Sequence, residues 1–432
     1  MTIPELYDLF LTHPTVCTDT RKIEKDCLFF ALKGANFDGN SFAEKALELG
    51  AAYAVVDATD LPDNSKFIVV EDVLSTLQKL ANHHRLQFEI PIIAITGSNG
   101  KTTTKELVSS VLERHYPTHY TRGNFNNHIG VPLTLLAMPI ETEVAIIEMG
   151  ANHVGEIGFL CEIAAPTHGL ITNIGRAHLE GFGGIEGVKK GKGELYRYLE
   201  KHRGLAFINQ EEDHLTEMAG EKLYKLFYRK SEAPNLNVPF FETQLVETKP
   251  FVKASFLSIE GLPQRVNSQL IGQYNFNNIM TAITLGRYFK VPNEKIVNAI
   301  ENYRPANNRS QIVEKSGNKF LLDAYNANPT SMANALKSFA GYEAARKIAI
   351  IGDMLELGEY SQAAHQEIVS LAKELDIALI TVGPIFHSLS LPYIPQFMDT
   401  PSLKLWFDRQ SYEGTSFLLK GSRGVGLEKL LS

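Results

Sequence analysis

Residues 96–103, TGSNGKTT, have the composition and the surroundings of a phosphate-binding loop. They follow an apolar, β-branched run at residues 92–95 and precede a helical pattern that begins at Lys101. Small residues in such a loop let backbone N–H groups point at phosphate oxygens, and the helix N-terminus adds a favourable dipole. Lys101 can then reach the β- and γ-phosphates, and the Thr102 hydroxyl can hold Mg²⁺. The predicted nucleotide-binding residues are Gly97, Ser98, Asn99, Gly100, Lys101, Thr102 and Thr103.

The strict eight-residue form of this loop would place a glycine where the chain has Ile95, so the loop is a shortened variant. The alternative is an ordinary glycine turn between a strand and a helix. We favour nucleotide binding, because the strand before the loop and the helix after it both agree with the motif.

Three further polar residues lie at or after strand-like runs of the same region. Glu148 ends the apolar run VAIIE, and open α/β sheets place ligands beyond the carboxyl ends of their strands. A carboxylate there either holds Mg²⁺ opposite the loop or is a solvated strand-end group. His178 follows the strand-like HGLITNI, and Lys192 comes fourteen residues later. By type alone they fit a structural histidine and a solvated lysine, so neither predicts a function by itself.

Two polar segments are rich in asparagine. Residues 123–132, GNFNNHIGVP, are too polar for a core. They fit either the recognition of peptide or phosphate groups or a plain turn. Residues 323–329, DAYNANP, similarly read as a strand end and a polar turn that leads into a helix.

The surrounding elements predict an α/β fold. The length of 432 residues corresponds to about three domains. Apolar runs that alternate with helical patterns predict a central, mostly parallel, doubly wound sheet. A small α/β domain is expected before it and a Rossmann-like α/β domain after it. We place the domains at residues 1–88, 89–309 and 310–432, with the second boundary in the polar stretch RPANNRS.

Local patterns predict further details. Asn40 or Ser41 is expected to cap a helix in SFAEKALELG. Residues 237–272 are strand-like without intervening helices, which predicts an antiparallel addition, and QIVEKS–GN–KFLLDAY is a hairpin candidate. Residues 377–398 lack Asp, Glu, Lys and Arg, but three prolines interrupt them. They therefore read as a buried strand and a loop, not as a membrane span.

Composition argues against several classes of protein. Lys and Arg total 42 and Asp and Glu 49, so the formal charge is −7, without the basic block of a nucleic-acid binder. Cys17, Cys27 and Cys161 are too few for a disulfide framework and suit a reducing cytosol. The start, MTIPELYDLF, lacks the pattern of a secretory signal. We expect a cytoplasmic enzyme with no membrane span and no nucleic-acid partner.

Together these segments resemble the Mur ligases, the ATP-dependent amide-forming enzymes of peptidoglycan synthesis. The resemblance covers essentially the whole chain and rests on TDTRKIEKDCLFFALKGANFDGNSF, ITGSNGKTTTKE, GNFNNHIGVPLTLL, IIEMGANHVGEI, AHLEGFGGIEGVKKGKGE, GQYNFNNIMTA, DAYNANPTSM and IIGDMLELGE. The family uses this shortened loop, which accounts for Ile95. DAYNANP and GDMLELGE resemble the family member that adds D-alanyl-D-alanine.

The resemblance implies roles for individual residues. It implies a catalytic set of Lys101, Glu148, His178 and Lys192, in which Lys192 matches a lysine that becomes carbamylated. Its implied magnesium ligands are Thr102, Glu148, His178 and Lys192. Positions near the adenine, the ribose or the domain hinge are Asn275, Asn278, Arg309 and Asp323. Positions that match the binding of a UDP-linked substrate are Asp19, Thr20, Arg21, Lys33, Gly34, Asn126 and Asn127, and His128 stands where relatives often have Asp.

The resemblance also implies a reaction. ATP would phosphorylate the terminal carboxylate of UDP-N-acetylmuramoyl-tripeptide, and the amine of D-alanyl-D-alanine would displace phosphate. Two anions meet in the first step, so Mg²⁺ and Lys101 are needed to neutralise charge. A carbamate on Lys192 would turn a cation into an oxygen donor suited to Mg²⁺. We expect a cytoplasmic, monomeric ligase of cell-wall synthesis, and hence of cell shape and division.

Two alternatives remain from the sequence. The first is another amide ligase, either a different Mur ligase or a folylpolyglutamate synthase-like enzyme. Folate enzymes lack a UDP-binding N-terminal domain, whereas residues 1–88 look like a complete one. The second is a phosphate-loop NTPase switch that makes no product, but a switch needs no second-substrate domains, and much of this chain lies outside the nucleotide core.

Overall fold

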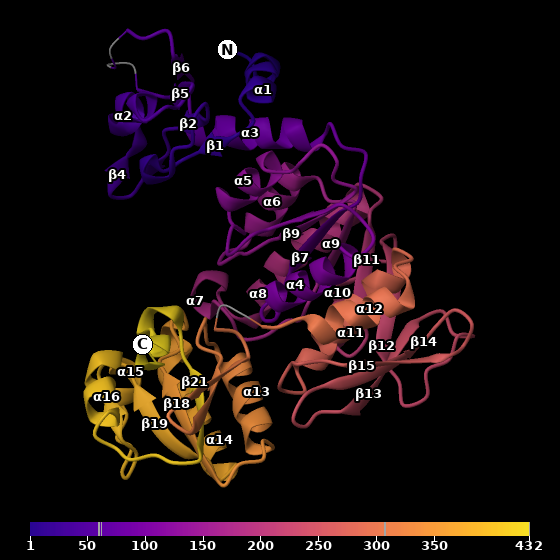
Figure 1. Cartoon of the computed structure of the whole chain (residues 1–432), viewed down its shortest axis with the longest axis vertical. Coiled ribbons are helices and arrows are strands. Elements are labelled where there is room, and N and C mark those ends of the chain that lie inside the picture. Colours follow the sequence, from indigo (N-terminus) through magenta and orange to yellow (C-terminus); the bar gives the residue numbers. More distant parts are fainter. Residues whose placement is uncertain (59–60, 62, 306–307, 432) are drawn as a thin grey trace.

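The computed structural model describes residues 1–58, 61, 63–305 and 308–431, and it has three α/β parts built on separate sheets (Figure 1). This confirms the three-domain α/β fold. Ala306 and Asn307, in the polar stretch chosen as the second boundary, lie outside the described residues. The exact boundaries at 88/89 and 309/310 stay predictions.

The N-terminal part holds a parallel sheet in the order β1-β2-β5-β6. Its strands are β1 (Val16–Cys17), β2 (Leu28–Phe30), β5 (Tyr53–Val56) and β6 (Phe67–Val69). Its helices are α1 (Ile3–Thr12), α2 (Ala43–Glu48) and α3 (Val73–Arg85). An antiparallel pair, β3 (Lys33–Gly34) and β4 (Phe37–Asp38), follows β2.

The expected cap of α2 is wrong. A 3₁₀ turn, Gly39–Phe42, precedes the helix, and no side chain caps it. Asn40 is buried instead and donates hydrogen bonds to the carboxylates of Asp38 (2.8 Å) and Asp57 (2.7 Å). Two acceptors therefore hold the amide in place away from the helix end.

Helix α3 joins the N-terminal part to the central part (Figure 1). Its Leu77 belongs to the same buried apolar cluster as Leu135 on α5 (Gly130–Leu136). Arg85 Nε donates to Ala164 O (3.0 Å), the last residue of α6 (Glu156–Ala164). These contacts fix the orientation of the N-terminal sheet relative to the central one.

The central part is built on a sheet in the order β15-β14-β13-β12-β11-β10-β7-β9-β8. Its strands are β7 (Ile92–Thr96), β8 (Thr118–Tyr120), β9 (Val144–Glu148), β10 (His168–Ile171), β11 (Leu205–Asn209), β12 (Tyr224–Lys230), β13 (Phe241–Glu247), β14 (Lys253–Leu257) and β15 (Pro263–Asn267). Strands β7 to β13 pair in parallel, and β14 and β15 are antiparallel, which confirms the predicted addition.

Helices cover both faces of the central sheet, as a doubly wound fold requires. On β7, Ile93 and Ile95 pack with α4 (Lys101–Leu112), α11 (Asn275–Tyr288) and α12 (Asn293–Asn302). Ile92 and Ala94 belong to the cluster on the other face, with α5, α6 and α9 (Glu194–Lys201). Helices α7 (Leu179–Phe182), α8 (Ile185–Lys192) and α10 (Asp213–Met218) also belong to this part.

The C-terminal part has a sheet in the order β16-β17-β21-β18-β19-β20. Its strands are β16 (Gln311–Lys315), β17 (Asn318–Leu322), β18 (Arg346–Gly352), β19 (Ala378–Val382), β20 (Gln396–Phe397) and β21 (Thr415–Lys420). Its helices are α13 (Pro329–Ala340), α14 (Ser361–Glu374), α15 (Pro384–Ser388) and α16 (Thr400–Phe407). The pair β16–β17 is the predicted hairpin, and the other pairings are parallel.

Residues 377–398 differ in part from the prediction. The buried strand is β19, but the expected loop contains α15, which begins at Pro384, and then β20. Proline suits the first position of a helix, because its missing N–H would be unpaired there. Within the described residues, no helix is long and apolar enough to span a membrane.

Candidate active site

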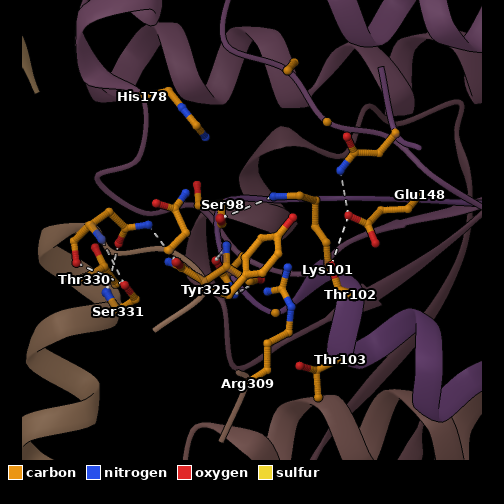
Figure 2. Close-up of a pocket in the computed structure, with 18 of the residues that line it drawn as sticks. Ser98, Lys101, Thr102, Thr103, Glu148, His178, Arg309, Tyr325, Thr330 and Ser331 are labelled. Atoms are coloured by element: carbon orange, nitrogen blue, oxygen red, sulfur yellow. Dashed lines mark hydrogen bonds between the residues drawn. The ribbon is translucent and has the colours of Figure 1, made fainter. Parts of the chain in front are cut away.

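A cavity of about 570 Å³ lies between the carboxyl edge of the central sheet and the C-terminal part (Figure 2). The predicted residues that line it are Ser98, Asn99, Gly100, Lys101, Thr102, Thr103, Asn126, Asn127, Glu148, His178, Asn275, Asn278, Arg309 and Asp323. Gly97, Lys192 and the N-terminal set from Asp19 to Gly34 are not among the residues that line it. The structure thus gathers most of the predicted site from distant segments.

The shortened loop depends on two glycines. Gly97 has φ +139°, and a Cβ there would lie 2.0 Å from Thr172 Oγ1. Gly100 has φ +79°, and a Cβ would lie 2.8 Å from Asn278 Oδ1. Residues with a side chain rarely adopt these backbone angles, and neither position has room for a Cβ atom. The residue that follows β10, Thr172, and helix α11 therefore pack directly against the loop backbone.

Lys101 begins α4 and folds back over the loop. Its Nζ donates to Gly97 O (2.7 Å) and Ser98 O (3.4 Å). Burial lowers the pKa of Lys101, and the nearby Glu148 carboxylate partly offsets this. The loop itself is held from outside, since Asn99 N donates to Asn173 Oδ1 (3.0 Å). The amine can therefore turn to a phosphate without loss of the loop's shape.

Glu148, at the end of β9, is 1% exposed and faces the loop. Its Oε1 accepts hydrogen bonds from Thr102 Oγ1 (3.2 Å) and Asn126 Nδ2 (2.8 Å) (Figure 2). Its Oε2 has no hydrogen-bond partner among the described residues and lies 3.9 Å from Lys105 Nζ. A buried carboxylate oxygen with an open position, beside a hydroxyl, is a donor set that fits Mg²⁺.

These protein groups do not complete a metal site alone. In the described part of the chain, no cluster of three or more His, Cys, Asp or Glu side chains could hold a metal ion. Mg²⁺ in nucleotide enzymes takes one or two carboxylates and fills its other positions with phosphate oxygens and water. The Glu148–Thr102 pair therefore fits an ion that arrives with the nucleotide.

His178 lies on the opposite side of the cavity from Glu148 (Figure 2). Its Nδ1 hydrogen-bonds Glu356 Oε2, on the loop after β18 of the C-terminal part. Burial lowers the pKa of His178, and the charge of Glu356 acts in the opposite direction. The structure thus does not bring His178 into contact with the other predicted magnesium ligands.

Lys192 is the buried lysine of its segment. It is 1% exposed, its Nζ donates to Ala151 O (3.1 Å), and it lies 5.1 Å from the centre of the Phe182 ring. Burial lowers its pKa well below the usual value, and the positive charge of Lys101 adds to this. Lys189 instead pairs with Glu186 (2.9 Å), and Lys190 is exposed. Of these three lysines, only Lys192 is buried.

The wall from α11 is a network of amides. Asn278 Nδ2 donates to Asn275 Oδ1 (2.8 Å), and Asn278 Oδ1 accepts from Thr104 Oγ1 (3.0 Å) on α4. Asn275 Nδ2 in turn donates to Ile271 O (2.7 Å). These bonds fix both asparagines at the cavity edge.

The C-terminal wall contains two residues that were not predicted from the sequence, Tyr325 and Lys420. The Arg309 guanidinium stacks 3.7 Å from the centre of the Tyr325 ring (Figure 2). Asp323 forms an ion pair with Nζ of Lys420 (2.7 Å), and the Lys420 side chain is buried. Lys420 ends β21, next to the end of β17, so the rule that ligands lie beyond strand ends pointed to it.

The two predicted substrate-side asparagines have different environments. Asn126 contacts Glu148, as described above, whereas Asn127 Oδ1 accepts from Ile129 N (3.1 Å) and Gly130 N (2.9 Å) at the start of α5. His128 O accepts from Gln78 Nε2 (2.9 Å) of α3. The segment therefore links the central cavity to the N-terminal part.

The N-terminal predicted residues share one edge of their sheet. Asp19 and Arg21 follow β1, and Lys33 follows β2, which pairs in parallel with β1. Arg21 donates to both oxygens of Asp19, holding the pKa of that carboxyl at about 2, and its side chain is 87% exposed. Lys33 pairs with Asp57 (2.8 Å). Thr20 and Gly34 lie in the same two segments.

Comparison with known proteins matches all three parts. The sequence matches the Mur ligase family catalytic domain over residues 15–85. It matches the Mur ligase middle domain over residues 95–286 and the Mur ligase, glutamate ligase domain over residues 308–390. The UDP-N-acetylmuramoyl-tripeptide–D-alanyl-D-alanine ligase of Bacillus subtilis is 34% identical, over 96% of this chain and 92% of its own length.

Two solved structures agree. MurF from Acinetobacter baumannii has a TM-score of 0.84 and 31% identity, and the match covers 96% of this chain and 92% of that one. The MurF ligase from Thermotoga maritima in complex with ADP has a TM-score of 0.84 and 25% identity, over 98% and 97% of the two chains. Because the likeness extends through all three parts in sequence and in structure, the chain belongs to the Mur ligase family.

Proposed function

We propose that this protein is an ATP-dependent, ADP-forming ligase that joins D-alanyl-D-alanine to the terminal carboxylate of UDP-N-acetylmuramoyl-tripeptide. This is a step in the synthesis of peptidoglycan precursors. The observation that carries the proposal is a phosphate-binding loop that opens into a cavity shared by the central and C-terminal parts. The named activity of the B. subtilis relative and the ADP in the T. maritima structure support the substrates and the nucleotide.

The chemistry needs a transferred phosphoryl group. A substrate carboxylate oxygen attacks the γ-phosphorus, ADP leaves, and an acyl phosphate forms. The D-alanyl-D-alanine amine then attacks the acyl carbon and loses a proton, and inorganic phosphate leaves. Lys101 would turn from Gly97 O to the transferring phosphate and stabilise its charge.

Glu148 and Thr102 would hold Mg²⁺ together with phosphate oxygens. The ion would neutralise the charge of the phosphates during transfer. Asn126 keeps the carboxylate turned toward Thr102 through its bond to Oε1. Because His178 lies across the cavity from this pair, we assign it to a separate metal position.

We further propose that Lys192 is carbamylated. Its neutral amine would bond to the carbon of CO₂ and release a proton, which turns the amine into an anionic oxygen donor. The lowered pKa of Lys192 supports this, because only the neutral amine reacts. The burial of the side chain would also shield the carbamate from water.

The nucleoside is assigned to the part of the cavity that is lined by Asn275, Asn278, Arg309 and Tyr325. Asn275 and Asn278 offer amide groups at its edge, and the stacked pair of Arg309 and Tyr325 forms a flat surface there. The pair of Asp323 and Lys420 would face the ribose or the phosphates. We further propose that the enzyme acts as a cytoplasmic monomer, as the resemblance to the Mur ligases implies.

The N-terminal part is proposed to bind the UDP group. Replacing Arg21 with alanine should raise KM for the UDP substrate at least about tenfold while KM for ATP changes little. The reason is the loss of a charge-assisted hydrogen bond to an anionic group. Steady-state kinetics with each substrate varied in turn would measure both values.

Lys22→Ala is the matched control, because Lys22 is an adjacent exposed cation. It should leave both KM values near those of the wild type. Equal rises in the two KM values for Arg21→Ala, or no rise for the UDP substrate, would remove Arg21 from the site.

A substrate-dependence assay separates the proposal from its alternatives. Purified protein would be given ATP and UDP-muramoyl-tripeptide that carries either lysine or diaminopimelate, with or without D-alanyl-D-alanine. ADP release should require both the tripeptide and the dipeptide. Release without either substrate would favour an NTPase switch, and release with folate and glutamate would favour the folate-type ligase.

A further inference from the structure

The segment GDMLELGE, residues 352–359, runs from the end of β18 through a loop into a 3₁₀ turn, and contacts within the C-terminal part hold it in place. The Asp353 carboxylate accepts hydrogen bonds from the backbone N–H groups of Ile385 and Phe386 (both 2.9 Å). Met354 N donates to His365 Nε2 (3.0 Å), and Leu355 N donates to Ser422 Oγ (2.9 Å). Leu357 is 1% exposed and belongs to the apolar core. Four hydrogen bonds and one buried side chain thus fix the residues on either side of Glu356.

The tip of this loop reaches the central part. Glu356 Oε2 hydrogen-bonds His178 Nδ1, and Glu356 O accepts from Glu180 N (3.4 Å) on α7. Glu356 has φ +63° and His178 has φ +52°. Positive φ is costly for residues other than glycine and persists where the surrounding structure requires it. Two residues in this unfavourable backbone state therefore meet across the boundary between two parts of the chain.

The bond determines which ring nitrogen of His178 carries a proton. A carboxylate only accepts hydrogen bonds, so Nδ1 must be the donor. In the neutral imidazole Nε2 then has its lone pair free, and His178 lines the cavity. Histidines that bind metals through one nitrogen commonly donate the other N–H to a carboxylate, which fixes the tautomer and the ring orientation.

We propose that Glu356 is a positioning residue for His178, and that it couples the docking of the C-terminal part to the readiness of the active site. Glu356 orients the imidazole so that Nε2 is unprotonated and presented for a metal ion. The coupling arises because the carboxylate comes from the C-terminal part, so undocking that part frees the ring. The metal-binding side of this inference rests on the proposed function.

Other contacts across the same boundary provide controls. Arg176 Nη2 pairs with Glu367 Oε2 (2.7 Å), and Asn328 Nδ2 donates to Asn99 Oδ1 (2.7 Å). Neither pair touches His178. Glu359 is exposed and three residues from Glu356 on the same loop. Glu367→Ala therefore removes a docking contact without touching His178, and Glu359→Ala removes a nearby carboxylate.

The first readout is the tautomer of His178. The full-length protein would be labelled with ¹⁵N-histidine, and His178→Asn would assign the ring signals. The wild type, Glu359→Ala and Glu367→Ala should show the form protonated at Nδ1, and Glu356→Ala should show a mixture of tautomers. Glu356→Gln should restore the wild-type form, because its amide oxygen still accepts from Nδ1. The Glu356 side chain is 56% exposed, so these variants should fold.

The second readout is metal affinity without turnover. Mn²⁺, used as a paramagnetic stand-in for Mg²⁺, would be titrated into protein saturated with ADP and followed by electron paramagnetic resonance. Glu356→Ala should weaken binding at one Mn²⁺ position about tenfold, the usual effect of losing such a partner. Glu359→Ala and Glu367→Ala should not.

Two results would overturn the proposal. They are an unchanged tautomer in Glu356→Ala and unchanged Mn²⁺ binding in that variant. Neither readout depends on amide formation. A protein that failed the ligase assay but showed these effects would therefore refute the proposed function and leave the Glu356–His178 coupling standing.

Discussion

Lys101→Ala should reduce kcat at least about a hundredfold, the scale expected for losing one group that stabilises transition-state charge. Lys101 begins α4 at the end of the phosphate-binding loop, and its amine already lies against the loop carbonyls at 2.7 and 3.4 Å. As the γ-phosphoryl group moves to the acceptor carboxylate, this amine would offset the negative charge on its oxygens. Steady-state kinetics with saturating substrates would measure the loss.

The fold should survive this substitution, because other groups hold the loop. Ser98 Oγ donates to Gly175 O (3.1 Å), and Asn99 N donates to Asn173 Oδ1 (3.0 Å). The thermal unfolding midpoint should therefore stay close to that of the wild type. A variant that kept more than about a tenth of wild-type kcat, a loss below roughly 1.4 kcal/mol, would contradict the role given to Lys101.

Lys192→Ala should be nearly inactive and should regain activity when short carboxylic acids such as acetate are added. The proposed carbamate would supply anionic oxygens, and the alanine variant would leave a small space in which a free carboxylate could replace them. Lys192 is 1% exposed, and its pKa is lowered well below the usual value by burial. Initial rates measured across a range of acetate concentrations would show the rescue.

Lys189→Ala and Lys190→Ala are the matched controls. Lys189 forms an ion pair with Glu186, and Lys190 is exposed, so neither is buried as Lys192 is. Both variants should lose little activity and show no response to acetate. Rescue of either neighbour would show that the carbamate is on that lysine and not on Lys192. Near-normal activity of Lys192→Ala without added acid would rule out an essential carbamate at Lys192.

Much of the fold was predictable from the sequence, because helices, strands and hairpins depend on the spacing of apolar residues and on turn residues nearby in the chain. The strand before the phosphate-binding loop, the helix after it and the hairpin at β16–β17 each follow from periodicity and turn residues. The predicted cap of α2 was wrong because the Asn40 amide donates a hydrogen bond to the Asp57 carboxylate, seventeen residues away. A tertiary contact of this kind leaves no trace in the local pattern.

The site divides in the same way. Strand-end and loop positions such as Lys101 and Glu148 were predictable, since parallel strands bring their carboxyl ends together. Glu356 was not, because it reaches His178 through a contact between two segments far apart in sequence. The choice of Lys192 over its neighbours rested on resemblance in the sequence, and burial now gives it a physical reason.

The most direct test of the account follows an oxygen atom from the acceptor to the phosphate. UDP-muramoyl-tripeptide labelled with ¹⁸O in its terminal carboxylate would be incubated with the protein, ATP and D-alanyl-D-alanine, and the inorganic phosphate analysed by mass spectrometry. If the carboxylate attacks ATP and phosphate leaves from an acyl phosphate, each amide formed should yield one phosphate that carries one ¹⁸O. Unlabelled phosphate released alongside product would contradict the acyl-phosphate route, and phosphate released with no amide would contradict the assignment as a ligase.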